Sequence, residues 1–149
     1  MVINMIRDIT QNDRTVFLDM AEVFYSTPAV AHKIERSLLE ATFNAAVGKS
    51  PYVRALIIED GDTPVGFALL SFTHSTEVGG LVVLLEELYV NETYRGKGLG
   101  SKLLKFIECE YPEAKRFRLE VTRNNARAID LYGKLGYKQL DYVQMVKDM

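Results

Sequence analysis

Residues 95–100 read Arg-Gly-Lys-Gly-Leu-Gly, and this stretch decides the fold class of the 149-residue chain. It lies between a long apolar segment, residues 81–90, and a segment with the apolar spacing of a helix, residues 98–111. Three glycines on alternate positions leave backbone N–H groups accessible where that helix begins. Because a helix N-terminus carries unpaired donors and about half a positive charge, it attracts phosphate. The stretch therefore predicts a site for an anionic, phosphate-bearing ligand, to which Arg95 and Lys97 add positive charge.

Two familiar phosphate-binding loops do not fit this spacing. The P-loop ends in Gly-Lys-Ser/Thr, whereas here the order is Gly-Ser-Lys at residues 100–102. The dinucleotide fingerprint is G-x-G-x-x-G, and this chain has G-x-G-x-G, one residue short. Glu120 does fall about where that fingerprint places a ribose-binding acid. Neither template explains the glycines.

The stretch instead fits the pattern Arg-x-x-Gly-x-Gly. Together with Glu86–Val90 it resembles the acetyl-CoA-binding segment of the GNAT superfamily of N-acetyltransferases. A second block is similar to the C-terminal helix of that family, Asn-x-x-Ala-x-x-x-Tyr followed by Gly-aromatic, and runs from Asn125 to Tyr137. The two blocks stand in the family's order and cover roughly residues 80–140, while the first half of the chain is matched by its element order alone.

Length and composition limit the classes of protein to which this chain can belong. The length is that of one domain, residues 1–149, and a net charge of -2 gives no basic surface for nucleic acid. No apolar run approaches the ~20 residues of a membrane span, and residues 1–10 lack the pattern of a signal peptide. A single cysteine, Cys109, excludes an internal disulfide, is expected in the core, and predicts a cytoplasmic protein. His32 and His74 stand in no metal-binding pattern, so no metal is expected.

The periodicity of apolar residues predicts an alternation of strands and helices. Strands are expected at 2–9, 53–59, 65–73, 81–90, about 117–121 and 137–146, and helices at 12–26, 30–47, 98–111 and after a cap at Asn124 or Asn125. This order, β-α-α-β-β-β-α-β-α-β, is the one the resemblance implies. The expected fold is therefore α/β (α+β), a single GNAT domain with a central mixed, mostly antiparallel sheet of six to seven strands flanked by about four helices.

Two adjacent carboxylates, Glu86 and Glu87, interrupt the long apolar strand. Successive strand residues face opposite sides, so one of the two should point into a cleft unless the backbone bulges there. The resemblance implies that Glu86 acts as general base, through water, with Glu87 as the second candidate. The alternative is that both are solvated charges at the end of a strand.

The resemblance also implies how acetyl-CoA would be held. The pyrophosphate would lie on the amides of residues 96–101, and the pantetheine arm would lie against the backbone of residues 88–90, where one N–H would serve as oxyanion donor. Tyr132 would be the general acid that protonates the departing thiolate, although its position also suits core packing. The implied cofactor-binding residues are Leu88, Tyr89, Val90, Arg95, Gly96, Lys97, Gly98, Leu99, Gly100, Ser101, Asn125, Ala128 and Tyr132.

The implied function is transfer of an acetyl group from acetyl-CoA to a primary amine of a small molecule or peptide, by direct attack in a ternary complex. The Glu86-Glu87 pair resembles the Glu-Asp pair of diamine and polyamine acetyltransferases, which favours a cationic small molecule. Tyr25, Tyr52 and Tyr94 are candidates to line the acceptor pocket. The alternatives are a domain that senses acyl-CoA without turnover and a nucleotide-binding regulator. A homodimer is expected through an edge strand near the C-terminus, with no nucleic-acid or membrane partner.

Overall fold

The computed structural model describes residues 4–149, and for Asn4 only the backbone. The predicted first strand is confirmed from residue 4 onward, while Val2 and Ile3 lie outside the described residues. The helices and strands are β1 (Asn4–Asp8), η1 (Gln11–Asp13), α1 (Arg14–Phe24), α2 (Arg36–Val47), β2 (Val53–Asp60), β3 (Thr63–Ser75), β4 (Gly80–Val90), η2 (Glu92–Tyr94), α3 (Leu99–Glu110), β5 (Arg116–Leu119) and α4 (Ala126–Lys134).

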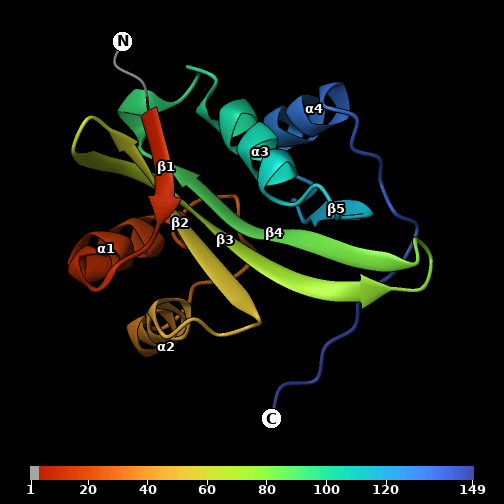
Figure 1. The fold of residues 1–149 in the computed structure, drawn as a ribbon, viewed down its shortest axis with the longest axis horizontal. Helices are drawn as coiled ribbons and strands as arrows, with labels where there is room; N and C mark the ends of the chain where they lie inside the picture. Colours follow the sequence, from red (N-terminus) through yellow and green to blue (C-terminus); the bar gives the residue numbers. More distant parts are fainter. Residues whose placement is uncertain (1–3) are drawn as a thin grey trace.

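One sheet with the strand order β1-β2-β3-β4-β5 forms the centre of the molecule. Strands β1 to β4 pair with one another in antiparallel fashion, and β5 runs parallel to β4. Helices α1 and α2 cover one face of the sheet, and α3 and α4 lie on the other (Figure 1). The prediction of a mixed, mostly antiparallel sheet with four helices on two faces is confirmed.

Two hydrophobic cores, one on each face, follow from the alternation of side chains along the strands. In β2, Ala55 and Ile57 face α1 and α2, whereas Leu56 and Ile58 face α3. The first core is built around aromatic rings, with Phe17 of α1 packed edge-on against Phe67 of β3 at 5.0 Å between centroids. The second core is aliphatic, and α3 contributes its buried stripe Leu99, Leu103, Leu104 and Ile107.

An ion-pair cluster joins the start of the chain to the sheet. The Arg7 guanidinium of β1 donates to both carboxylate oxygens of Asp13, at 2.8 and 2.9 Å, and to Glu59 Oε1 of β2 at 2.6 Å. Asp13 and Glu59 are buried, with exposed fractions of 5% and 7%. Because buried carboxylates are costly without a partner, Arg7 is the residue that makes this arrangement stable.

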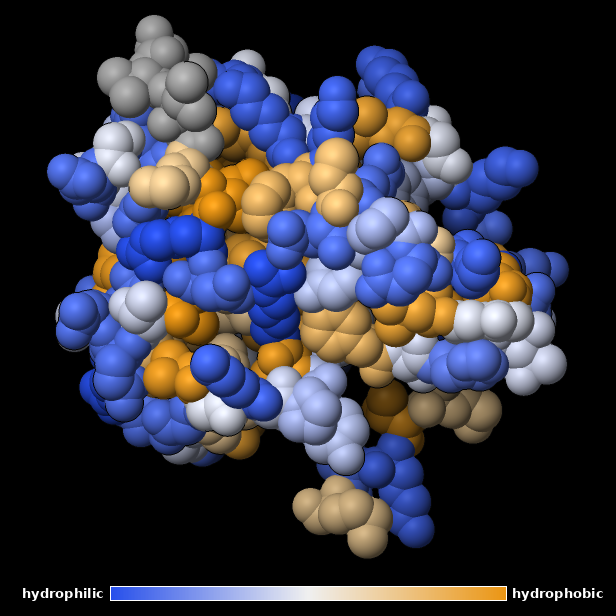
Figure 2. Space-filling model, viewed as in Figure 1, coloured by the Kyte–Doolittle hydropathy of each residue, from blue (hydrophilic) through white to orange (hydrophobic). Residues whose placement is uncertain are grey.

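The predicted closing strand is wrong, and the sheet has five strands rather than six or seven. Residues 137–149 contain no helix or strand, and Val143 and Met145 are 90% and 91% exposed. Their sequence suits a strand, but a strand needs a hydrogen-bonded neighbour, and within the described residues the outer edge of β5 pairs with nothing. The segment is tied to the body by side chains, such as Tyr142 to Glu77, and its end projects from the molecule (Figure 2).

Two further expectations need correction. The second helix begins at Arg36 rather than near residue 30, so residues 25–35 form a long loop between α1 and α2. Cys109 is exposed rather than in the core, because the buried stripe of α3 lies on the opposite side of that helix. Among the residues described here, no helix combines the length and apolar character needed to cross a membrane.

Candidate active site

A β-bulge separates the two adjacent carboxylates of β4. Leu69 of β3 pairs with Glu87 and its neighbour Leu70 pairs with Leu85, so Glu86 is an extra residue in the ladder. Glu86 is exposed, and Ser71 Oγ donates to its Oε1 at 2.7 Å. Glu87 is only 8% exposed and lies on the face covered by α1 and α2, as its ladder partner Leu69 does. The strand therefore presents one carboxylate to solvent and buries the other.

The same strand forms one wall of a cleft. β4 and β5 pair from Val82–Arg116 to Leu85–Leu119 and no further. Beyond that point the edge of β4 that faces β5, from Glu86 to Val90, has no strand beside it. A backbone edge left open in this way can hydrogen-bond an extended ligand as if the ligand were a further strand.

The glycine-rich stretch adopts the backbone that its sequence predicts. Gly96 and Gly98 have φ angles of +75° and +80°, which side chains with a Cβ rarely adopt. Gly98 is the N-cap of α3, and among the described residues no side chain caps this helix. The first main-chain bond of the turn runs from the Lys102 N–H to the Gly98 carbonyl, at 3.0 Å. The amides before Lys102 thus have no intrahelical acceptor and are free to bind an anion.

Positive charge gathers beside these amides. Arg95 donates from Nε to the Val90 carbonyl at 2.8 Å, and its guanidinium lies over the Tyr89 ring at 5.9 Å. Lys97 Nζ lies 5.1 Å from the centroid of the Tyr94 ring. These contacts hold two cations on the rim of the glycine stretch, where they add to the positive end of the α3 dipole.

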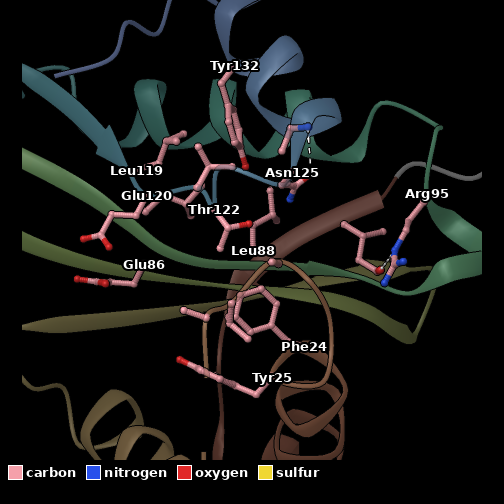
Figure 3. Close-up of a pocket in the computed structure, with 17 residues that line it drawn as sticks. Phe24, Tyr25, Glu86, Leu88, Arg95, Leu119, Glu120, Thr122, Asn125 and Tyr132 are labelled. Atoms are coloured by element: carbon pink, nitrogen blue, oxygen red, sulfur yellow. Dashed lines mark hydrogen bonds between the residues drawn. The ribbon is translucent and has the colours of Figure 1, made fainter. Parts of the chain in front are cut away.

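A cavity of about 510 Å³ occupies the cleft (Figure 3). Arg95 lies at one end, and Glu86 and Glu120 lie at the other, with Leu88 and Tyr132 between them (Figure 3). The lining comes from both faces of the sheet and from the α1–α2 loop. The residues are Phe24, Tyr25, Ala29, Val30, Ala31, Leu85, Glu86, Leu88, Val90, Arg95, Leu119, Glu120, Val121, Thr122, Asn125, Ala128 and Tyr132.

The α1–α2 loop, residues 25–35, is hydrogen-bonded to the segment between β5 and α4 across the cleft. Thr122, in the segment between β5 and α4, donates from Oγ1 to the Pro28 carbonyl at 2.9 Å. Ala29, Val30 and Ala31 of the loop follow directly and line the cavity. Segments about 94 residues apart in the chain therefore share one wall.

Tyr25 connects the cavity with the buried carboxylate. Its ring packs edge-on against Phe24 at 5.2 Å, and its hydroxyl interacts with the Glu87 carboxyl. Burial raises the pKa of Glu87 to about 7, and the neighbouring negative charge of Glu86 adds to this shift. Burial, together with the charge of Glu87, raises the pKa of the Tyr25 hydroxyl. Near neutral pH, Glu87 is therefore divided between its neutral and charged forms.

The C-terminal helix places three of the predicted residues on the cavity. Asn125 is the N-cap of α4, and its Oδ1 accepts a hydrogen bond from the Ala128 N–H at 3.3 Å. Tyr132 lies two turns further along and points from α4 into the cavity (Figure 3). Burial raises the pKa of the Tyr132 hydroxyl, so it stays protonated at neutral pH.

Seven of the fifteen predicted site residues line this cavity, namely Glu86, Leu88, Val90, Arg95, Asn125, Ala128 and Tyr132. The predicted diphosphate site, residues 96–101, directly follows Arg95 in the chain but is not part of the lining. Leu99 is buried in the core at 3% exposure, so its side chain has no access to a ligand and only its amide does. Tyr89 likewise packs inward, stacked on Phe67 at 5.9 Å. Glu87 is not part of the lining. Of the three tyrosines suggested for the acceptor pocket, Tyr25 lines it, whereas Tyr52 and Tyr94 do not.

Sequence reasoning missed Glu120 and Thr122 as residues of this site. In the sequence, Glu120 fits only the position of a ribose-binding acid, a role that belongs to a different phosphate-binding loop. Its position directly after an alternating strand was the available signal, because polar residues at the end of a strand that borders a cleft are candidates for binding.

Comparison with known proteins agrees with this fold and identifies the family. The sequence profile of the acetyltransferase (GNAT) family matches residues 15–137. Thialysine N-epsilon-acetyltransferases are 36% identical over 103 residues in Sus scrofa and 30% over 145 residues in Mus musculus. These matches cover 62% and 91% of this chain, and 60% and 84% of those enzymes. The spermine/spermidine N(1)-acetyltransferase of Bacillus subtilis is 38% identical over 66 residues, which cover 40% of this chain and 43% of that enzyme.

A solved structure extends the likeness to the whole fold. A possible acetyltransferase from Clostridium difficile 630 has a TM-score of 0.82 with 18% identity, over 99% of this chain and 98% of that one. A central sheet with an open β4–β5 cleft, a glycine stretch at the start of α3 and a tyrosine on α4 define the class of fold. The chain belongs to the GNAT family of acetyltransferases.

Proposed function

We propose that the protein transfers the acetyl group of acetyl-CoA to a primary amine of a small, cationic molecule, by direct attack within a ternary complex. When bound, acetyl-CoA supplies an acetyl group held by a thioester bond, which breaks as the amine nitrogen bonds to the carbonyl carbon and leaves a thiolate. The residues of the cleft supply binding, orientation and two proton transfers.

The glycine stretch that follows Arg95, at one end of the cleft, fits a diphosphate. Gly96 and Gly98 have positive φ angles, and the amides at the start of α3 have no acceptor within the helix. Arg95 and Lys97 lie on the same rim. Amides, the helix dipole and two cations together match an anion with several oxygens. Asn125 and Ala128 line the cleft on the α4 side, where they would border the arm of the same molecule.

The open edge of β4 suits the reacting carbonyl. Main-chain amides between Leu88 and Val90 have no strand beside them on the β5 side. One such N–H, directed at the carbonyl oxygen, would stabilise the negative charge that develops there, an effect of roughly 3 kcal/mol in comparable sites. Because these amides belong to a strand held by β3 on its other edge, their orientation is set before the substrate binds.

Glu86 is our candidate general base. An alkylammonium has a pKa near 10, so an amine that enters at neutral pH must lose a proton before its nitrogen can attack. Glu86 lines the cavity and is exposed, and Ser71 holds one of its oxygens at 2.7 Å. Its carboxylate can therefore accept the proton directly or through a water molecule. Glu87 is a weaker candidate, because it is buried on the other face of the sheet.

Tyr132 is our candidate general acid. Its hydroxyl points into the cleft between the two ends, and burial raises its pKa. A protonated hydroxyl in this position can donate its proton to the departing sulfur, after which solvent restores it. The tyrosine lies on a helix whose start is capped by Asn125, so its position does not depend on a flexible loop.

A single observation carries this proposal: one cavity has Arg95, the residue before the glycine stretch at the start of α3, at one end and Glu86 and Glu120 at the other, with Tyr132 between them. The test is release of coenzyme A thiol from acetyl-CoA in the presence of a panel of amines. We expect turnover with at least one cationic amine, and a loss of roughly 100-fold in kcat for Tyr132→Phe with acetyl-CoA binding retained. Tyr52→Phe, at an exposed tyrosine outside the cleft, is the matched control.

Glu86→Gln should lower kcat by a similar factor at pH 7 and recover part of it at pH 9, where more of the amine is already neutral. Acetyl-CoA binding measured by calorimetry, without turnover for any amine, would instead indicate a domain that senses acyl-CoA. Unchanged turnover in both variants would refute the two roles assigned here.

We further propose that the protein forms a homodimer and is cytoplasmic. β5 is an edge strand with its outer side open among the described residues, and the C-terminal segment exposes Val143, Met145 and Val146. Exposed apolar side chains beside an open strand edge favour pairing with another chain. The cytoplasmic location is supported by the single cysteine, which excludes an internal disulfide.

A further inference from the structure

Two carboxylates stand opposite one another at the point where β4 and β5 separate. The last pair of the parallel ladder is Leu85 with Leu119, and the next residues along the two strands are Glu86 and Glu120. Both line the same cavity. Figure 3 shows their carboxyl groups on one side of the cavity, directed the same way, with the Tyr25 hydroxyl on that side too.

Neither carboxylate is neutralised by the protein. Ser71 donates to Glu86 at 2.7 Å, and Gln144 of the C-terminal segment donates to Glu120 at 3.3 Å, and both donors are uncharged. Among the residues that the structure describes, neither acid forms an ion pair. Acidic residues elsewhere do, for example Glu22, Glu40, Glu77 and Glu110.

The one cation in the lining lies away from this pair. Arg95 is at the opposite end of the cavity, where its Nε is bound to the Val90 carbonyl (Figure 3). Glu120 also borders a second cavity, whose lining includes Arg116, Arg118, Arg123 and Lys138, and no described residue among these forms an ion pair with it. The acceptor end therefore presents two exposed carboxylates whose hydrogen-bond partners are uncharged, an arrangement that attracts a positively charged group.

We propose that Glu120 is a specificity-determining residue, which binds a second cationic group of the acceptor while Glu86 serves the reacting amine. This inference rests on the proposed function. The acceptor it describes is a short molecule with two ammonium groups. One proton passes from the reacting ammonium to Glu86, and the second ammonium keeps its charge and stays bound to Glu120.

The C-terminal segment takes part in this recognition. Gln144 donates a hydrogen bond from Nε2 to Glu120 Oε1. This bond orients the carboxylate and leaves its other oxygen free to accept a hydrogen bond from the ligand. Glu120 is thus held from a segment that carries no strand or helix of its own.

The test compares 1,4-diaminobutane with 1-aminobutane, which have the same chain length and differ in one ammonium group. In the wild-type protein we expect a higher kcat/KM for the diamine. Glu120→Gln should raise the KM for the diamine about tenfold, with kcat retained, and should leave the monoamine unchanged. Glu120→Asp keeps the charge and should restore part of the preference. Glu113→Gln, at an exposed glutamate that does not line this cavity, controls for net charge.

Two results would overturn the proposal. If Glu120→Gln lowers kcat for both amines alike, Glu120 takes part in the proton transfer instead. If the wild-type protein has equal kcat/KM values for the two amines, the second ammonium group makes no binding contact.

A second measurement tests diamine binding by Glu120 independently of acetyl transfer. Calorimetry of 1,4-diaminobutane with protein saturated with coenzyme A should show binding that Glu120→Gln weakens about tenfold, even if no amine is turned over. In that case the acetyl-transfer proposal would fail while the role of Glu120 stood. Binding unaffected by the substitution would refute the role of Glu120 alone.

Discussion

Glu86 and Glu87 are neighbours in the chain, yet their carboxyl groups lie in opposite surroundings. The bulge at Glu86 leaves that side chain exposed in the cleft, with Ser71 as its donor, while Glu87 is 8% exposed on the other face of the sheet. Burial raises the pKa of Glu87 to about 7, whereas Glu86 stays in contact with solvent. Two residues of the same chemical type can therefore be distinguished by experiment.

Stability should depend on pH through Glu87. Its folded pKa is raised from 4.5 to about 7, so the native state binds this proton more tightly than the unfolded chain does. The free energy of unfolding should then fall by about 3 kcal/mol as the pH rises through that window, and level off above it. Glu87→Gln should remove this slope in urea unfolding at pH 5 and pH 8. Glu86→Gln is the control and should keep most of the slope, because burial is the main cause of the shift and the charge of Glu86 only adds to it. A slope that persists in Glu87→Gln would show that another group causes it.

The glycines of residues 96–100 should differ in their tolerance of alanine. Gly98 has a φ of +80° at the N-cap of α3, so Gly98→Ala should cost about 1–2 kcal/mol and weaken coenzyme A binding. Gly100 lies within the helix, and a Cβ there would meet Leu88 Cδ2 at an ordinary 3.7 Å. Gly100→Ala should therefore leave stability unchanged or higher. Thermal unfolding and calorimetry of both variants test the difference, and equal losses would contradict it.

The ion-pair cluster at the start of the chain should matter more than surface ion pairs. Arg7→Leu leaves two buried carboxylates, Asp13 and Glu59, without their partner, and should cost about 2–3 kcal/mol. Arg14→Leu removes an exposed pair with Glu40 and should cost less than about 1 kcal/mol. Urea unfolding at pH 7 measures both, and similar values for the two would show that burial is not the cause.

The proposed dimer depends on the C-terminal segment. Val143 and Met145 are almost fully exposed in the single chain, so their replacement by serine should not affect its folding. Light scattering at micromolar concentration should give a dimer for the wild type and a monomer for the double variant. Val23→Ser, at a half-exposed valine of α1, should remain dimeric. A monomeric wild type would refute the proposal.

Much of the fold could be predicted from local patterns because each pattern has a local cause. The helix start at Gly98 and the helix cap at Asn124 or Asn125 depend on residues a few positions apart. Both are confirmed, and Asn125 is the cap.

The features that could not be predicted depend on partners distant in the chain. Which of Glu86 and Glu87 reaches the cleft is decided by the register between Leu69 and Leu70 of β3. Glu120 joins the site because β5 pairs in parallel with β4 and then diverges from it. The prediction of a strand at 137–146 was wrong for a related reason. The apolar pattern of a segment does not tell whether the edge of another strand lies beside it to pair with it.

The bulge also means that Glu86 can be deleted without a shift in the pattern of the strand. On either side of Glu86 the side chains of β4 face the two cores alternately, with Leu85 and Leu88 on the α3 side and Glu87 and Tyr89 on the other. Excision of Glu86 alone would join two segments that are already in phase, so the shortened strand would be regular and every core contact would keep its place. The fold and the outward acid are thus separable: a chain that lacks Glu86 alone should keep both cores and lose only the carboxylate that faces the cleft.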